Sequence, residues 1–153
     1  MKAVIQRVRH ASVRVDGSIV GKIEQGYLVL VGVAAGDTDA DAEKLAQKTA
    51  NLRVFTDEQD KMNRSILDVG GSVLAISQFT LLADVKKGNR PSFIGAGEPC
   101  EAQRLYDVYC AALQKNGVQR VEKGVFGAHM EVELLNDGPV TILYDTEIWK
   151  GSK

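Results

Sequence analysis

The sequence has little of what marks a secreted, membrane-bound or metal-dependent protein. Its 153 residues include only two cysteines, two histidines and three prolines, and no apolar run approaches the length that a bilayer requires. The first residues follow the alternating pattern of a strand, without the apolar segment and cleavage site of a secretion signal. We therefore expect a cytoplasmic protein that does not bind a membrane.

The few cysteines and histidines are poorly placed for cross-links or metal ions. Cys100 and Cys110 lie in one predicted helix, separated by about 15 Å along its axis, which excludes a disulfide between them. His10 and His129 are far from each other in sequence, and neither has a cysteine at ligand spacing. The sequence therefore predicts neither a metal nor a cofactor.

Common catalytic signatures are absent as well. The sequence has no G-x-S-x-G nucleophile motif, no phosphate-binding loop, no H-E-x-x-H zinc motif and no G-x-G-x-x-G dinucleotide motif. If the chain is an enzyme, it is not one of the standard hydrolases.

Neither sign of charge dominates, because 19 Lys and Arg face 20 Asp and Glu, for a net charge of -1. This balance argues against a protein that coats DNA with a broad basic face, so any nucleic-acid contact should be local. The short basic groups available for such a contact are Arg7, Arg9 and Arg14, then Lys86, Lys87 and Arg90, then Arg120 and Lys123. Most of these charges are better explained as ordinary solvated surface.

What the sequence does contain is the length and composition of a single domain, which we expect to span residues 1–153. Apolar periodicity predicts strands at residues 3–8, 11–15, 19–23, 27–33, 72–81, 130–135 and 140–144, and helices at 39–52 and 100–115. Thr38 is the predicted N-cap of the first helix, Asp16-Gly17 predicts a hairpin turn, and the apolar run 27–33 predicts a strand buried on both faces. This order predicts an α+β fold, in which two helices pack against a mainly antiparallel, barrel-like sheet.

Four consecutive residues near the end of the predicted strand 72–81 form the first candidate site: Ser77, Gln78, Phe79 and Thr80. An apolar strand turns polar here, and chain segments that leave a rigid scaffold commonly carry functional groups. Ser77 or Thr80 could be a nucleophile or a donor, Gln78 could position a substrate, and backbone N–H groups could form an oxyanion hole. The simpler interpretation is an ordinary strand end, because neither histidine is placed to activate a nucleophile.

The segment Asn136-Asp137-Gly138-Pro139 is the second candidate. These residue types are the usual ones in a turn. Alternatively, the Gly138-Pro139 peptide is held cis and presents a rigid pair of backbone acceptors. Composition does not choose between the two.

Two further segments have a functional and a structural interpretation. Phe126 and Met130, with Gly127 and His129, could form a pocket for an adenine ring, or they could be ordinary core residues. Arg90-Pro91-Ser92-Phe93 could hold a phosphate and a base, or it could anchor a long loop to the core.

The first two candidates resemble the two signature motifs of the D-aminoacyl-tRNA deacylase family, also called the D-tyrosyl-tRNA deacylases. The matching residues are Ser77-Gln78-Phe79-Thr80-Leu81 and Asn136-Asp137-Gly138-Pro139-Val140-Thr141. Shorter matches extend the resemblance over nearly the whole chain, at Gln6-Arg7-Val8, Lys61-Met62-Asn63, Gly70-Gly71-Ser72, Arg90-Pro91-Ser92-Phe93 and Phe126-Gly127-Ala128. One departure is Asp60, at a position where the family usually has glycine.

The resemblance implies a homodimeric hydrolase that cleaves the ester between a D-amino acid, or glycine, and the terminal adenosine of a tRNA. The site residues that it implies are Ser77, Gln78, Phe79 and Thr80 in the catalytic pocket, Phe126 and Met130 against the adenine, and Arg7 in support. It further implies that Gly138-Pro139 enters the partner subunit's pocket as a cis peptide and excludes L-amino acids. The expected partners are thus the 3′ end of a D-aminoacyl-tRNA and a second copy of the chain.

The resemblance allows two roles for Thr80. It is either an acyl-accepting nucleophile or a pocket residue in a reaction where the 2′-hydroxyl of the tRNA activates water. The missing base favours the RNA-assisted reaction. A non-catalytic module that binds the 3′ end of RNA, and a general Thr80-dependent esterase, are the competing hypotheses.

Overall fold

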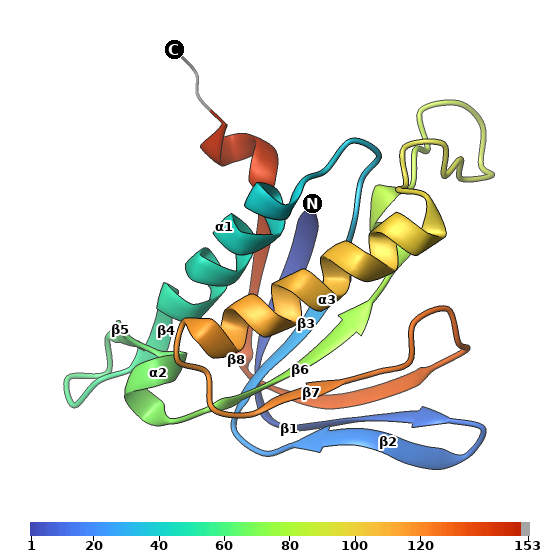
Figure 1. Cartoon of the computed structure of the whole chain (residues 1–153). Helices are drawn as coiled ribbons and strands as arrows, with labels where there is room; N and C mark the ends of the chain where they lie inside the picture. Colours follow the sequence, from blue (N-terminus) through green and yellow to red (C-terminus); the bar gives the residue numbers. More distant parts are fainter. Residues whose placement is uncertain (151–153) are drawn as a thin grey trace.

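A computed structural model describes residues 1–150 (Figure 1), and residues 151–153 of the predicted domain lie outside the described residues. In chain order the elements are β1 (Lys2–Val15), β2 (Ser18–Ile23), β3 (Gly26–Gly32), α1 (Asp39–Asn51), β4 (Arg53–Thr56), β5 (Met62–Ser65), α2 (Ile66–Val69), β6 (Ser72–Ser77), the 3-10 helix η1 (Phe79–Leu82), α3 (Pro99–Lys115), β7 (Val121–Lys123), β8 (Glu131–Asp145) and the 3-10 helix η2 (Thr146–Trp149). The described residues form one α+β domain, as predicted.

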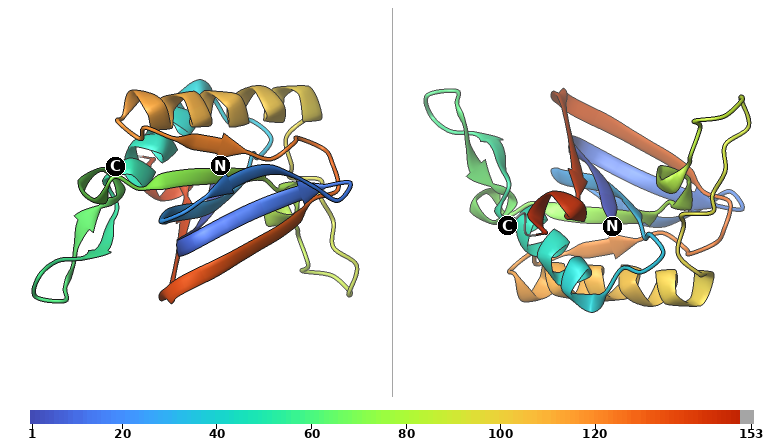
Figure 2. Two further views of the ribbon diagram at one scale, coloured as in Figure 1. Left: turned by 90° about the horizontal axis from the view of Figure 1, so that it is seen from below. Right: turned by 90° about the horizontal axis from the view of Figure 1, so that it is seen from above.

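A six-stranded sheet forms the centre of the fold, in the order β2-β1-β3-β6-β7, with β8 also paired to β1. β1 is antiparallel to β2, β3 and β8, whereas β6 is parallel to both β3 and β7. The sheet curls towards a barrel, and α1 and α3 lie side by side over one face (Figure 2). The barrel-like sheet is therefore confirmed, but it is mixed. The sequence does not predict the parallel pairs, because they join strands that are distant along the chain.

Several predicted boundaries are wrong. The strands predicted at 3–8 and 11–15 are the single strand β1, and those predicted at 130–135 and 140–144 are the single strand β8. Both are continuous because they pair with each other over most of their length, and this long-range ladder carries them through their polar interruptions. The strand predicted over 72–81 ends at Ser77, where η1 takes over, and the elements β5, β7 and α2 are not predicted at all.

β3 is buried on both faces, as its apolar run predicts. Tyr27, Val29 and Val31 belong to the core between the sheet and the helices, whereas Leu28 belongs to a second core inside the curled sheet. The neighbouring β6 alternates between the two cores in the same way. The carboxyl ends of these two strands are therefore held by apolar packing on both sides.

Local sequence signals place the helices and the first hairpin correctly. Thr38 and Asp41 form a reciprocal capping box at the start of α1, in which the Thr38 N–H donates to Asp41 Oδ2 (2.9 Å). Asp16 and Gly17 both have positive φ angles, 51° and 80°, and they join β1 to β2 as a tight hairpin. Every helix within residues 1–150 is too short or too polar to cross a bilayer.

β8 bulges outward opposite Arg7. Gln6 pairs with Thr141 and Val8 pairs with Asn136, so the intervening residues of β8 are looped out of the ladder. The peptide between Gly138 and Pro139, at the tip of this bulge, is cis, and both residues are exposed. The segment is thus a bulge within one strand, and the interpretation as a turn between two strands is wrong.

Candidate active site

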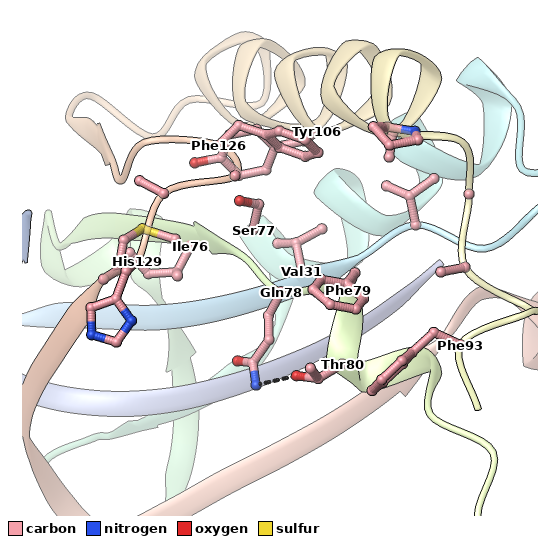
Figure 3. Close-up of a pocket in the computed structure, with 18 of the residues that line it drawn as sticks. Val31, Ile76, Ser77, Gln78, Phe79, Thr80, Phe93, Tyr106, Phe126 and His129 are labelled. Carbon is pink, nitrogen blue, oxygen red and sulfur yellow. Dashed lines mark hydrogen bonds between the residues drawn. The ribbon is translucent and has the colours of Figure 1, made fainter. Parts of the chain in front are cut away.

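A cavity of about 670 Å³ opens where β3 and β6 end (Figure 3). The ends of these strands and η1 form its floor, while the loop before α3, the start of α3 and the segment 126–132 form its walls. The predicted pocket residues that line it are Ser77, Gln78, Phe79, Thr80, Phe126 and Met130. The structure therefore brings together two segments that are distant in sequence.

The floor takes its shape from a sharp change of direction after β6. The Gln78 N–H donates to Val31 O (2.8 Å), which is the last link to β3, and the chain then turns into η1. Gly32 makes room for this turn, since an added Cβ there would lie 2.7 Å from Leu82 Cδ2. Gln78 Nε2 donates to Thr80 Oγ1 (2.8 Å), which holds both polar side chains at the edge of the cavity.

The start of η1 lies in the lining of the cavity. The leading N–H groups of a helix have no partner within the helix, and the side chain of Gln78 caps none of them. The N–H groups of Phe79 and Thr80 are therefore available to a ligand oxygen. Donors fixed in this way stabilise negative charge that develops on a carbonyl oxygen during acyl transfer.

Two aromatic pairs form much of the wall. Phe79 packs edge-on against Phe93, with ring centroids 4.9 Å apart, and the ring of Tyr106 lies 6.3 Å from that of Phe126. The Tyr106 hydroxyl donates to Ala75 O (2.6 Å), and burial raises the pKa of this phenol. Tyr106 is thus a neutral wall residue whose hydroxyl proton is bonded to a backbone carbonyl.

The polar side chains of the cavity form no catalytic pair. Within residues 1–150, no carboxylate, lysine or arginine lines the cavity, and His129 lies apart from Ser77 and Thr80 without a hydrogen bond to either (Figure 3). Across the same residues, no three His, Cys, Asp or Glu side chains gather to hold a metal ion. The cavity itself supplies shape, stacking surfaces and hydrogen-bond donors.

The other three predicted site residues lie outside this cavity. Arg7 is buried in β1, where its Nε donates to Asp137 O (2.8 Å) and its Nη1 donates to Val54 O. Arg7 thereby fixes the backbone next to Gly138 and Pro139. The structure does not bring Gly138 and Pro139 to the cavity of their own chain.

Known sequences resemble this chain over nearly its whole length. The model of the D-Tyr-tRNA(Tyr) deacylase family matches residues 4–145. The chain belongs to this family. A relative named D-aminoacyl-tRNA deacylase, from Thermomicrobium roseum, is 59% identical over 151 residues, which cover 99% of this chain and 97% of that protein. Another of the same name, from Thermus aquaticus, is 54% identical over the full length of both.

Two solved structures share the fold of this deacylase-family chain. One, named c-Myc DNA Unwinding Element Binding Protein, has a TM-score of 0.89 and 41% identity, and the match covers 95% of this chain and 98% of that one. The other is described as a probable eukaryotic D-amino acid tRNA deacylase, with a TM-score of 0.80 and 17% identity over 94% and 97% of the two chains. At that lower identity the likeness shows the fold alone.

Sequence reasoning missed most of the apolar residues that line this deacylase-family pocket, and Tyr106 is the largest of them. Tyr106 was missed, although it follows Ala102 by four residues on α3 and both line the cavity, so a helical face pointing to the site was present in the sequence. Phe93 has two interpretations, and the structure is consistent with both, because its ring packs against Phe79 and also lines the cavity.

Proposed function

We propose that this chain hydrolyses the ester of D-aminoacyl-tRNA, and of mischarged glycyl-tRNA, to release the amino acid and the tRNA. The observation that carries this proposal is the cavity of about 670 Å³. Its lining includes Ser77 to Thr80 together with Phe126 and Met130. A space of this size is typical of ligand sites and suits a terminal adenosine with one amino acid attached. The reaction is a proofreading step of translation, and hence a cytoplasmic one.

The adenine is proposed to lie against Phe126 and Met130. Unpaired bases stack on aromatic rings, and methionine sulfur makes favourable contacts with ring edges. Met130 packs closely over Gly124, where an added Cβ would lie only 2.6 Å from the Met130 Sδ. With the base held there, the ester on the ribose would face Ser77 to Thr80.

In the proposed mechanism, the scissile carbonyl oxygen accepts hydrogen bonds from the N–H groups of Phe79 and Thr80. The 2′-hydroxyl of the terminal ribose activates water, which attacks the carbonyl carbon, and the bond to the ribose 3′ oxygen breaks with a proton passed to that oxygen. Thr80 is proposed as a pocket residue, because its Oγ1 accepts from Gln78 and no described residue is bonded to it as a base.

Rejection of L-aminoacyl esters is proposed to come from Gly138 and Pro139 of a second copy. In support, both residues are exposed, lie outside the cavity of their own chain, and are attached to a backbone that the buried Arg7 holds. Their carbonyls would face the alpha carbon of the amino acid and leave no room for an L side chain. The homodimer is therefore part of the proposal.

The direct test measures hydrolysis of D-tyrosyl-tRNA, glycyl-tRNA and L-tyrosyl-tRNA by the purified chain. We expect the first two esters to be cleaved and the third to be spared. Survival of the D-tyrosyl ester, with binding of the charged tRNA intact, would instead support a non-catalytic module for the 3′ end of RNA.

The RNA-assisted mechanism has its own test. We expect Thr80→Ala to retain most activity, whereas a D-tyrosyl-tRNA with a 2′-deoxy terminal adenosine should be cleaved at least about 100-fold more slowly, the usual size of a general acid–base contribution. The opposite pattern, with Thr80→Ala inactive and the deoxy substrate cleaved normally, would identify a Thr80-dependent esterase.

A further inference from the structure

The long loop before α3 carries a basic tip at the rim of the cavity. Asp84 and Ser92 pair through both backbone hydrogen bonds (2.7 and 2.8 Å), and this pair closes the loop at its base. The tip carries Lys86, Lys87 and Arg90, all exposed, and residues 85–97 contain no Asp or Glu, although the carboxylate of Asp84 at the base of the loop accepts from the Lys86 N–H (2.9 Å). Figure 1 shows the loop standing away from the body near the start of α3.

These three cations differ from most arginines of the chain. Arg104 and Arg120, for example, are held by carboxylates, whereas none of the three tip cations forms an ion pair with a residue in the range 1–150. An exposed cluster of like charge repels itself and gains free energy when an anion approaches. The tip is therefore an unneutralised positive surface on a chain whose net charge is -1.

The base of the same loop is part of the cavity wall. Phe93 packs against Phe79, while Ala96 and Gly97 line the cavity, and the Gly97 N–H donates to Val33 O (2.8 Å) at the end of β3. The base of the loop is thus fixed to the cavity wall, and it holds the basic tip next to the rim. Within residues 1–150 no Lys or Arg lines the cavity, so a cation that contacts a phosphate of the bound ligand would lie outside it, as the tip cations do.

We propose that Lys86, Lys87 and Arg90 bind the phosphates of the single-stranded 3′ end that precede the terminal adenosine of the tRNA. The inference rests on the proposed function, and it adds a recognition surface for the part of the RNA that stays outside the pocket. Proteins usually hold single-stranded nucleic acid with cations placed along its phosphate backbone and with aromatic side chains on which its bases stack. The pair Phe79 and Phe93 supplies the aromatic surface at this rim.

The experiment compares D-tyrosyl-tRNA with D-tyrosyl-adenosine, which carries the same ester and terminal nucleoside but has no phosphate. The test variant replaces all three tip cations by glutamine, and the control variant removes the same charge elsewhere, through Lys44→Gln, Lys61→Gln and Lys115→Gln. These control lysines are also exposed, and none forms an ion pair within residues 1–150. Wild type and both variants are assayed on both substrates between 50 and 200 mM salt.

We expect the tip variant to lose kcat/KM on D-tyrosyl-tRNA through KM, while it cleaves D-tyrosyl-adenosine like the wild type. Three phosphate contacts on a single strand correspond to a change of about 18-fold in affinity over this salt range, so the tip variant should lose about that much salt dependence. The control variant should behave like the wild type.

Equal losses in the tip and control variants, or no loss in either, would overturn the inference. So would a matching loss on D-tyrosyl-adenosine, because that would mean a damaged pocket. The proposed function fails separately, if the wild-type chain leaves both D-tyrosyl esters intact.

Discussion

The buried Arg7 connects three parts of the chain through one guanidinium group. It lies in β1, it donates to Val54 O on β4 and to Asp137 O on β8, and only 9% of its surface is exposed. Arg7→Met would leave these carbonyl oxygens without their donors. We expect a loss of roughly 3 kcal/mol in the free energy of unfolding, measured by urea denaturation.

The neighbouring Arg9 is the matched control for this substitution. Its Nε lies 3.7 Å from Asp137 Oδ1, but its side chain is 71% exposed, so water screens the pair. Arg9→Met should change the free energy of unfolding by less than about 0.5 kcal/mol. Equal effects of the two substitutions would mean that the buried contacts of Arg7 do not stabilise the fold.

Asp60 occupies a backbone conformation that suits glycine, the residue that the family usually has there. Its φ angle is 61°, in the left-handed region that side chains disfavour. Asp60→Gly should therefore raise the free energy of unfolding by about 1 kcal/mol. Asp60→Ala is the control, because it removes the same carboxylate and keeps the strain. If Asp60→Ala raised the free energy of unfolding as well, the stabilisation would come from the loss of the carboxylate charge and not from relief of backbone strain.

The residues of the cavity could be named from the sequence only through the resemblance. By physical pattern alone, Ser77 to Thr80 are an ordinary strand end, and Phe126 with Met130 are ordinary core. Their meeting depends on the parallel pairing of β3 with β6 and on the space that Gly32 leaves for η1. Those are long-range contacts, which no short window of sequence contains.

Elements with strong local signals were predictable, and elements made by long-range pairing were not. The capping box at Thr38 and the Asp16-Gly17 turn each involve residues within three positions of one another, so a short window of sequence is enough. The continuity of β1 and β8, by contrast, comes from their mutual ladder, which holds even across the bulge at Gly138 and Pro139. The short strand β7 likewise exists only because β6 is beside it.

The capping box of α1 makes stability depend on pH. Burial works to raise the pKa of Asp41, but hydrogen bonds from the Thr38 N–H and the Lys150 ammonium outweigh it and leave the pKa below its usual value. Because the pKa of Asp41 is lower in the folded state, its ionised carboxylate stabilises the fold above the pKa of the unfolded state, which is about 4. This stabilisation is lost as the pH falls through the lower pKa of the folded state.

We therefore expect Asp41→Asn to be less stable than the wild type at pH 7, and the two proteins to converge as the pH falls below about 4. Urea denaturation of both proteins over this range measures the difference. A difference that stays constant with pH would show that the cap depends on hydrogen bonding alone and not on the charge of Asp41.

At the scale of the whole molecule, the proposed filter predicts that Gly138 of one subunit controls the cavity of the other. Ser77→Phe fills the cavity of its own subunit and should abolish its activity. Gly138→Ala disturbs the bulge, because its Cβ would lie 2.7 Å from Val140 Cγ2 and φ is 148°, so it should let the partner's cavity cleave L-tyrosyl-tRNA. A mixed dimer would contain one intact cavity, filtered by one intact Gly138. Refolding Gly138→Ala with an equal amount of Ser77→Phe should therefore about halve the cleavage of L-tyrosyl-tRNA and leave that of D-tyrosyl-tRNA unchanged.

The control for this experiment refolds Gly138→Ala alone, which should not change its cleavage of L-tyrosyl-tRNA. Light scattering should also give the mass of a dimer for the wild type and for both variants. If cleavage of L-tyrosyl-tRNA stays the same although mixed dimers form, Gly138 and Pro139 do not act across subunits, and their role in rejecting L-aminoacyl esters would need another explanation.

The double burial of β3 has a consequence for motion. Its amides lie between β1 and β6 within the sheet, and side chains cover both of its faces, so they should exchange with deuterium only when the whole domain unfolds. The exposed loop tip at Lys86 and Lys87 should exchange through local opening. The part of the cavity floor that β3 forms would then keep its shape on every timescale shorter than global unfolding, while the loop tip above it moves about a fixed base.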